Sequence, residues 1–185
     1  MISRKYLKDY QIAERFDENG RVKSEAIYIG GDYTLSPRTS TGDKKLILYL
    51  SVLSCLAYMG ALIPISQAAH IIYVIIPFIL SAIPIFMMTA ASVSLYRAKE
   101  AMTRAEAEKI SNRLPPCSLF TAILAGTAFL GHTITAVVVS YDKFVPGDII
   151  FSALSLLLLI VSIIAYTKCY RIKAIKPLQN LPSEQ

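Results

Sequence analysis

The sequence predicts an all-α membrane protein, a four-transmembrane-helix bundle with both termini cytoplasmic and a small N-terminal cytoplasmic β-hairpin. Three observations lead to this fold class. The chain has 185 residues, of which 54 % are apolar and only 17 % are charged, whereas soluble domains usually carry about 25 % charged residues. Residues 46–96, 114–141 and 149–167 contain no Asp, Glu, Lys or Arg, and the Lys and Arg outside them are distributed unevenly. This composition excludes an ordinary soluble enzyme, a disulfide-rich secreted domain and a disordered chain.

The charge-free stretches are long enough for four membrane crossings. About 20 apolar residues cross the hydrocarbon core as a helix, so the first stretch, with 51 residues, holds two crossings. A break is expected near Pro64 and His70, and Pro115-Pro116 and Pro146-Gly147-Asp148 precede the later spans. The membrane domain is residues 46–167, and its expected helices cover residues 46–65, 68–96, 118–140 and 149–167.

Orientation follows from the basic residues, which short cytoplasmic segments retain. Residues 1–45, 97–113 and 168–185 hold 18 of the 19 Lys and Arg, and only Lys143 falls on the other side. Both termini are therefore expected in the cytoplasm. The first 45 residues lack the apolar core of a signal peptide, and no Asn-X-Ser/Thr sequon occurs. These features favour a bacterial cytoplasmic membrane. Seven acidic residues are interleaved in residues 1–45, so nucleic acid is not an expected partner.

The N-terminal segment, residues 1–45, is expected to contain a β-hairpin over residues 10–28. A three-residue loop at Glu18-Asn19-Gly20, with glycine in the left-handed position, is a common hairpin connection. This loop pairs Asp17 with Arg21 and sets the register of both strands. One face then becomes apolar and aromatic, and we expect it to dock on the bundle, the middle loop or another protein, because a lone hairpin is marginal in water. The candidate docking residues are Tyr10, Ile12, Phe16, Val22 and Tyr28.

A short cytoplasmic helix is expected over residues 104–114, between the second and third spans. Thr103 and Glu106 form the pattern of a capping box, in which each side chain bonds an amide at the helix start. Pro115 is expected to end this helix. Residues 168–185 form a basic cytoplasmic tail, whose Lys and Arg side chains are expected to meet anionic lipid headgroups.

Within the predicted spans, the candidate binding residues lie on the second and third helices. His132 is the one ionisable side chain deep in a predicted span. It acts either as a proton-carrying or ligand-binding group or as a neutral histidine that is hydrogen-bonded to a neighbouring helix. Pro77 and Pro84 each lack an N–H, so a kink is expected in the second helix. A binding stripe would comprise Tyr73, Pro77, Ser81 and Pro84. Small residues four apart favour close helix packing, here at Ala122, Gly126, Thr127 and Gly131.

No arrangement of residues indicates catalysis, a cofactor or a metal. The spans hold no Asp, Glu, Lys or Arg, which argues against proton-coupled transport, and Cys55, Cys117 and Cys169 lack zinc-site spacing. We therefore expect a non-enzymatic accessory or assembly subunit of a larger membrane complex, with the lipid bilayer and a protein partner or homo-oligomer as its contacts. One alternative is a small-molecule transporter or channel acting as an oligomer. Another is an immunity-type protein against a membrane-active toxin.

Overall fold

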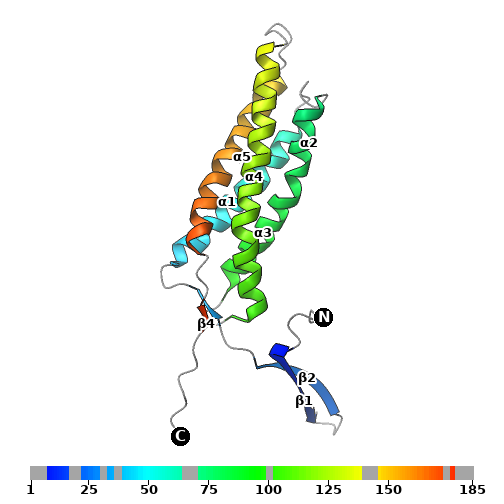
Figure 1. The fold of residues 1–185 in the computed structure, drawn as a ribbon, viewed down its shortest axis with the longest axis vertical. Helices are drawn as coiled ribbons and strands as arrows, with labels where there is room; N and C mark the ends of the chain where they lie inside the picture. The colour runs from blue at the N-terminus through cyan, green and yellow to red at the C-terminus, as the bar shows by residue number, and fades with distance from the viewer. Residues whose placement is uncertain are drawn as a thin grey trace.

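The computed structural model is mostly helical, with a small hairpin beside a bundle (Figure 1). Four helical segments are long and apolar enough to cross a membrane: Thr41–Leu62, Ile72–Arg97, Arg104–Val138 and Pro146–Arg171. The four expected spans are thus confirmed by length and composition. The structure describes residues 8–16, 22–29, 33–35, 39–63, 71–98, 102–138, 146–172 and 176–177.

The four spans alternate in direction through the bundle, and the second span is made of two consecutive helices (Figure 1). The helices are α1 (Thr41–Leu62), α2 (Ile72–Leu80), α3 (Ala82–Arg97), α4 (Arg104–Val138) and α5 (Pro146–Arg171). We call the end where α1 begins and α5 ends the near end, and the opposite end the far end. Helix α4 packs on α5, α3 and α2, while α1 packs on α5 and α3. The core has a near cluster around Met88, Leu95 and Leu114 and a far cluster around Phe78, Ile85 and Leu158.

Buried hydroxyl groups are mostly bonded within their own helices. Ser92 donates to the Met88 carbonyl at 2.8 Å, and Thr121 donates to the Cys117 carbonyl at 2.9 Å. Such local bonds satisfy polar atoms that lipid and core cannot. Small side chains of this kind therefore let the helices approach closely while most of their hydroxyl groups are hydrogen-bonded; among the described residues, the buried Ser162 hydroxyl is an exception.

The second span is interrupted at Ser81, between α2 and α3. Pro84 cannot donate to the Leu80 carbonyl, which weakens the helix at this point. The Ser81 N–H still bonds the Pro77 carbonyl at 3.0 Å, and its hydroxyl donates to the Phe78 carbonyl at 2.6 Å. The structure thus places a one-residue break in the helix between the two prolines, where the kink is expected. This span starts at residue 72 rather than at the expected residue 68, which lies outside the described residues.

The expected separation of a cytoplasmic helix, residues 104–114, from a third span, residues 118–140, is wrong. Helix α4 is continuous from Arg104 to Val138 and contains both Pro115 and Pro116. The two prolines leave the carbonyls of Ser111 and Asn112 without their usual helical N–H donors. The Ser118 hydroxyl bonds one turn further on, where it approaches the carbonyls of Leu114 and Pro115 at 3.0 and 2.9 Å. The described helix ends at residue 138, two residues before the expected end.

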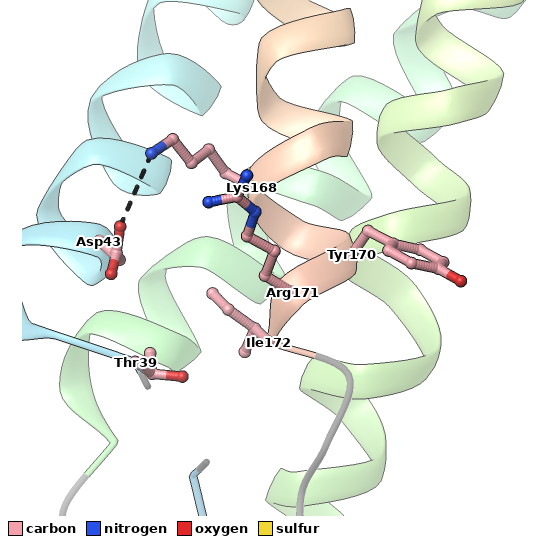
Figure 2. Close-up of a pocket in the computed structure, with 6 residues that line it drawn as sticks. All are labelled: Thr39, Asp43, Lys168, Tyr170, Arg171 and Ile172. Atoms are coloured by element: carbon pink, nitrogen blue, oxygen red, sulfur yellow. Dashed lines mark ion pairs between the residues drawn. The ribbon is translucent and has the colours of Figure 1, made fainter. Parts of the chain in front are cut away.

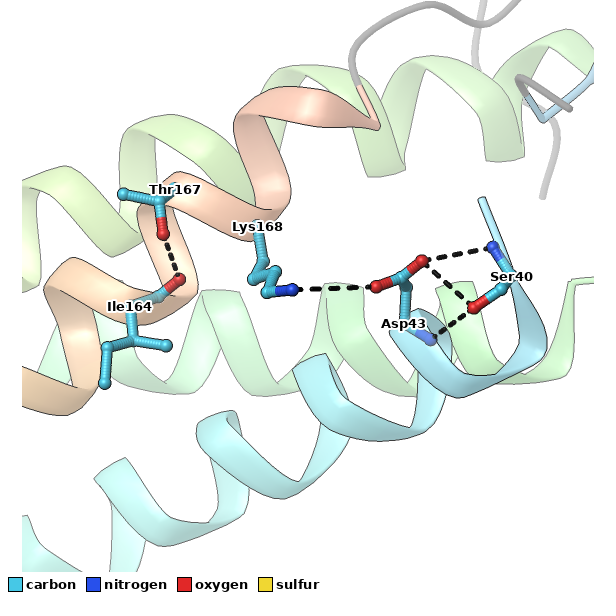
Figure 3. Close-up of polar contacts among 5 residues, drawn as sticks. All are labelled: Ser40, Asp43, Ile164, Thr167 and Lys168. Carbon is cyan, nitrogen blue, oxygen red and sulfur yellow. Dashed lines mark hydrogen bonds and ion pairs between the residues drawn. The ribbon is translucent and has the colours of Figure 1, made fainter. Parts of the chain in front are cut away.

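The first and fourth spans also differ at their ends. Helix α1 begins at residue 41 rather than 46 and ends at 62 rather than 65. Its start is set by a capping box, in which Ser40 and Asp43 bond each other's backbone N–H (Figure 3). Helix α5 covers residues 146–171 instead of 149–167, so it includes Asp148 and extends into the predicted tail. The helix is therefore longer than its charge-free segment and carries charged residues in its first and last turns.

Polar contacts join the helix ends at the near end. Lys168 of α5 lies 4.0 Å from the Asp43 carboxylate of α1, measured from Nζ to Oδ1 (Figure 3). Lys44 donates from Nζ to the carbonyl of Ala98, the C-cap of α3, at 3.1 Å. A cation at this position satisfies a terminal carbonyl and favours the negative end of the helix dipole.

The N-terminal hairpin consists of β1 (Tyr10–Phe16) and β2 (Val22–Tyr28) in antiparallel pairing. Tyr10 pairs with Tyr28, Ile12 with Ala26 and Phe16 with Val22, which confirms the expected register. Asp17, Arg21 and the loop between them lie outside the described residues.

Two short strands form a second pairing at the near end, β3 (Tyr33–Thr34) and β4 (Lys176–Pro177). Tyr33 also exchanges both backbone hydrogen bonds with Met102, just before α4. The segments before α1, between α3 and α4, and after α5 are therefore tied together by backbone bonds.

Candidate functional site

The most unusual polar feature of the described bundle is a buried pair formed by His132 and Asp148. His132 Nε2 lies 3.7 Å from Asp148 Oδ1, and the two side chains are 5 % and 4 % exposed. His132 comes from the far half of α4, and Asp148 from the first turn of α5. A buried carboxylate is costly unless it is paired, so this contact stabilises both residues in an apolar setting.

Asp148 was missed as a site residue because it was placed in the turn before the fourth span. Its sequence context nevertheless contains a helix-start signal. Proline is favoured at the first helical position, and acidic residues are favoured in the first turn by the helix dipole. Pro146 begins α5 and Asp148 lies in its first turn. This signal predicts Asp148 in the first turn of the fourth helix, whereas its contact with His132 is a finding of the structure.

Aromatic side chains connect the pair to the other helices. The His132 ring lies 5.4 Å from the ring of Phe151, centroid to centroid. Phe151 packs edge-on against Phe78 at 5.1 Å, and Phe78 stacks on Tyr58 at 4.9 Å. The far core thus links α4, α5, α2 and α1 through ring contacts, which fix the orientation of His132.

A groove of about 470 Å³ opens beside the pair between α4 and α5. Its lining combines His132, Asp148 and Ser152 with apolar side chains such as Phe129 and Leu156. This mixture suits an apolar or weakly polar molecule with one hydrogen-bonding group, because the groove offers a few polar atoms on an apolar wall. Among the described residues, no group of three or more His, Cys, Asp or Glu is positioned to hold a metal ion.

The stripe predicted on the second span does not line this groove. The Tyr73 hydroxyl instead bonds the Thr135 hydroxyl of α4 at 2.6 Å. Pro77 is half-buried, whereas Ser81 and Pro84 are buried in the bundle. The structure therefore brings Tyr73 to the helix that carries His132, but it does not gather the stripe and His132 around one cavity.

Three of the four predicted small packing residues face neighbouring helices. A Cβ added at Gly131 would lie 3.2 Å from side-chain atoms of both Tyr73 and Val74 on α2. A Cβ at Gly126 would lie 3.4 Å from Leu159 of α5. Ala122 is buried, whereas Thr127 is exposed on the outer surface of α4.

The predicted docking residues of the hairpin lie on the two paired strands. Ile12 is 74 % exposed, and Tyr10 is half-buried near the base of the hairpin. Phe16, Val22 and Tyr28 occupy the register positions expected for the same face. The base of the hairpin lies near the start of α4, where Asp9 is within electrostatic reach of Arg104.

Comparison with protein-family models, with curated proteins and with solved structures gave no match to this chain. The class of protein is therefore defined by the fold itself. It is a helical bundle with four helices long and apolar enough to span a membrane and with a small two-stranded sheet outside it.

Proposed function

We propose that this chain is a non-enzymatic integral protein of the bacterial cytoplasmic membrane that binds a protein partner, as an accessory or assembly subunit of a larger complex. Both termini would lie in the cytoplasm. The orientation is supported by the distribution of Lys and Arg, because 18 of 19 fall in the segments at the near end.

The observation that carries the proposal is the exposed apolar surface of the hairpin. Ile12, on the predicted docking face, is 74 % exposed, and Ile27 and Ile29, on the opposite face of the hairpin, are 43 % and 58 % exposed. Unlike the apolar faces of the helices, these residues lie on a hairpin that extends away from the bundle (Figure 1). A two-stranded hairpin with apolar side chains in water gains stability by covering them. A protein surface in the cytoplasm would provide that cover.

The packing of the bundle supports the same function. Buried side chains such as Phe78, Met88 and Leu158 fill the space between the spans. The groove beside His132 lies between two adjacent helices. A filled four-helix bundle suits a membrane anchor that positions a binding segment.

Paired substitutions on the two faces test the hairpin as the docking element. Ile12→Asp places a charge on the proposed docking face, while Ile27→Asp makes the same change on the opposite face. We expect a stoichiometric partner to copurify in mild detergent with the unaltered chain and with Ile27→Asp, and to be lost with Ile12→Asp. Purification of the chain alone, or equal retention by both variants, would reject the proposal.

Thiol labelling tests the orientation. Ile63→Cys places a thiol at the 82 % exposed end of α1 at the far end, and Thr41→Cys places one at its exposed start. A membrane-impermeant maleimide should label Ile63→Cys on intact spheroplasts and Thr41→Cys only after permeabilisation. The reverse pattern would contradict the proposed orientation.

A second candidate function rests on the polar pair in the lateral groove. A neutral small molecule would enter between α4 and α5 and bond His132, and an oligomer would complete its path. Flux into liposomes should then fall with His132→Ala, while Pro77→Ala tests whether the break near Ser81 is needed. Unchanged flux in both variants would exclude this path.

A further inference from the structure

A pocket of about 420 Å³ lies at the near end, where the last turn of α5 meets the first turn of α1 (Figure 2). Two basic side chains, Lys168 and Arg171, line it together with Asp43 and Thr39. In Figure 2 both basic side chains lie on the side of α5 that faces α1, whereas Tyr170 points away. The pocket is separate from the hairpin and from the groove beside His132.

The charges of this pocket leave one cation without an acidic partner. Asp43 is already engaged by the backbone N–H and hydroxyl of Ser40, at 3.2 and 3.0 Å, and by Lys168. Within the described part of the chain, Arg171 makes no ion pair. One carboxylate therefore faces two basic groups, and an arginine with five N–H donors remains available for an anion.

The position along α5 indicates the level of this pocket in a membrane. The charge-free run of α5 ends at residue 167, so Lys168 and Arg171 follow directly after the apolar segment. Basic side chains at such a boundary extend toward the headgroup layer. The first turn of α1 lies beside them, and its positive helix end adds a favourable field for an anion.

We propose that this pocket binds the phosphate of an anionic phospholipid headgroup. The Arg171 guanidinium donates hydrogen bonds to two phosphate oxygens, and the Lys168 ammonium contributes a second positive charge. The acyl chains lie along the apolar outer surfaces of α1 and α5. A bound lipid thus joins the start of the first span to the end of the last. This proposal does not depend on the hairpin's binding a partner or on the orientation of the chain.

The test is lipid binding to the full chain in neutral detergent, measured by native mass spectrometry. Phosphatidylglycerol is the anionic probe, phosphatidylcholine is the zwitterionic lipid, and inorganic phosphate is the soluble competitor. Arg171→Gln should weaken phosphatidylglycerol binding about fivefold, the effect of one basic residue at an anionic surface. Arg113→Gln is the matched control. Arg113 is exposed in the near half of α4, and it does not line the pocket.

Asp43→Asn provides a second variant with the opposite expected sign. It removes the one carboxylate among the described residues that line the pocket, so phosphatidylglycerol should bind more tightly even if the capping box weakens. A general loss of structure would instead reduce binding in every variant. Equal effects of Arg171→Gln and Arg113→Gln, or equal binding of both lipids, would overturn the proposal. Displacement by millimolar inorganic phosphate would overturn the lipid as the source of the anion.

Discussion

The contact between His132 and Asp148 can be tested by a double-substitution cycle. The variants are His132→Leu, Asp148→Ala and the double variant. The two groups are 3.7 Å apart and almost fully buried. Opposite full charges at this distance attract by about 4–5 kcal/mol at an effective dielectric constant of about 20. A neutral imidazole leaves a hydrogen-bond-like interaction of about 1 kcal/mol. We therefore expect a coupling free energy of about 1–3 kcal/mol, in the range found for contacting groups.

The assay is reversible unfolding in mixed detergent micelles, followed by far-ultraviolet circular dichroism. Each single variant should lower the free energy of unfolding. The sum of the two single losses should exceed the loss in the double variant by the coupling free energy. His132→Leu with Ser92→Ala is the matched control cycle, because Ser92 lies in the near half of α3 and bonds its own helix. Additivity within about 0.5 kcal/mol for His132 and Asp148 would show that the two groups do not act as a pair.

Two further pairs of substitutions test the packing and the helix ends. Gly131→Ala should be less stable than Gly126→Ala by about 1 kcal/mol or more, because its Cβ meets two side chains at 3.2 Å whereas that of Gly126 meets one flexible leucine end at 3.4 Å; equal melting temperatures would contradict this. Lys44→Met should lower the free energy of unfolding by about 0.3–1 kcal/mol, since it removes the bond to the Ala98 carbonyl. Lys45→Met should change it by less than about 0.5 kcal/mol, and equal losses would refute the capping role.

The features that sequence predicted best are those in which two independent signals agree. The hairpin register is predicted both by a three-residue loop at Glu18-Asn19-Gly20 and by the apolar face that this loop aligns. Tyr10 and Ile12 pair with the expected residues for this reason. The four spans are similarly supported by both length and freedom from charge. Where one signal stood alone, as at the helix ends, the boundaries differ by up to five residues, and by fourteen at the start of α4.

The continuous α4 shows why a local rule was insufficient. A proline inside a helix costs about 3 kcal/mol, which predicts a break at Pro115. However, Ile110, Leu114 and Cys117 recur at spacings of four and three across this point, and all three are buried in one cluster. A break would rotate part of that face out of the core. The packing of Ile110, Leu114 and Cys117 in the core therefore outweighs the missing backbone bonds.

The pair of His132 and Asp148 could not be predicted by counting charges along the chain. Such counting ends a span at the first charged residue, whereas a helix starts where its end groups are satisfied. Two factors stabilise Asp148 inside the helix. The helix start favours a carboxylate, and His132 lies opposite it. An aspartate that only capped the helix would be equally stable facing water. Its burial against a histidine beside a groove is therefore the observation that distinguishes a site from a cap, and the coupling between the two residues measures that difference.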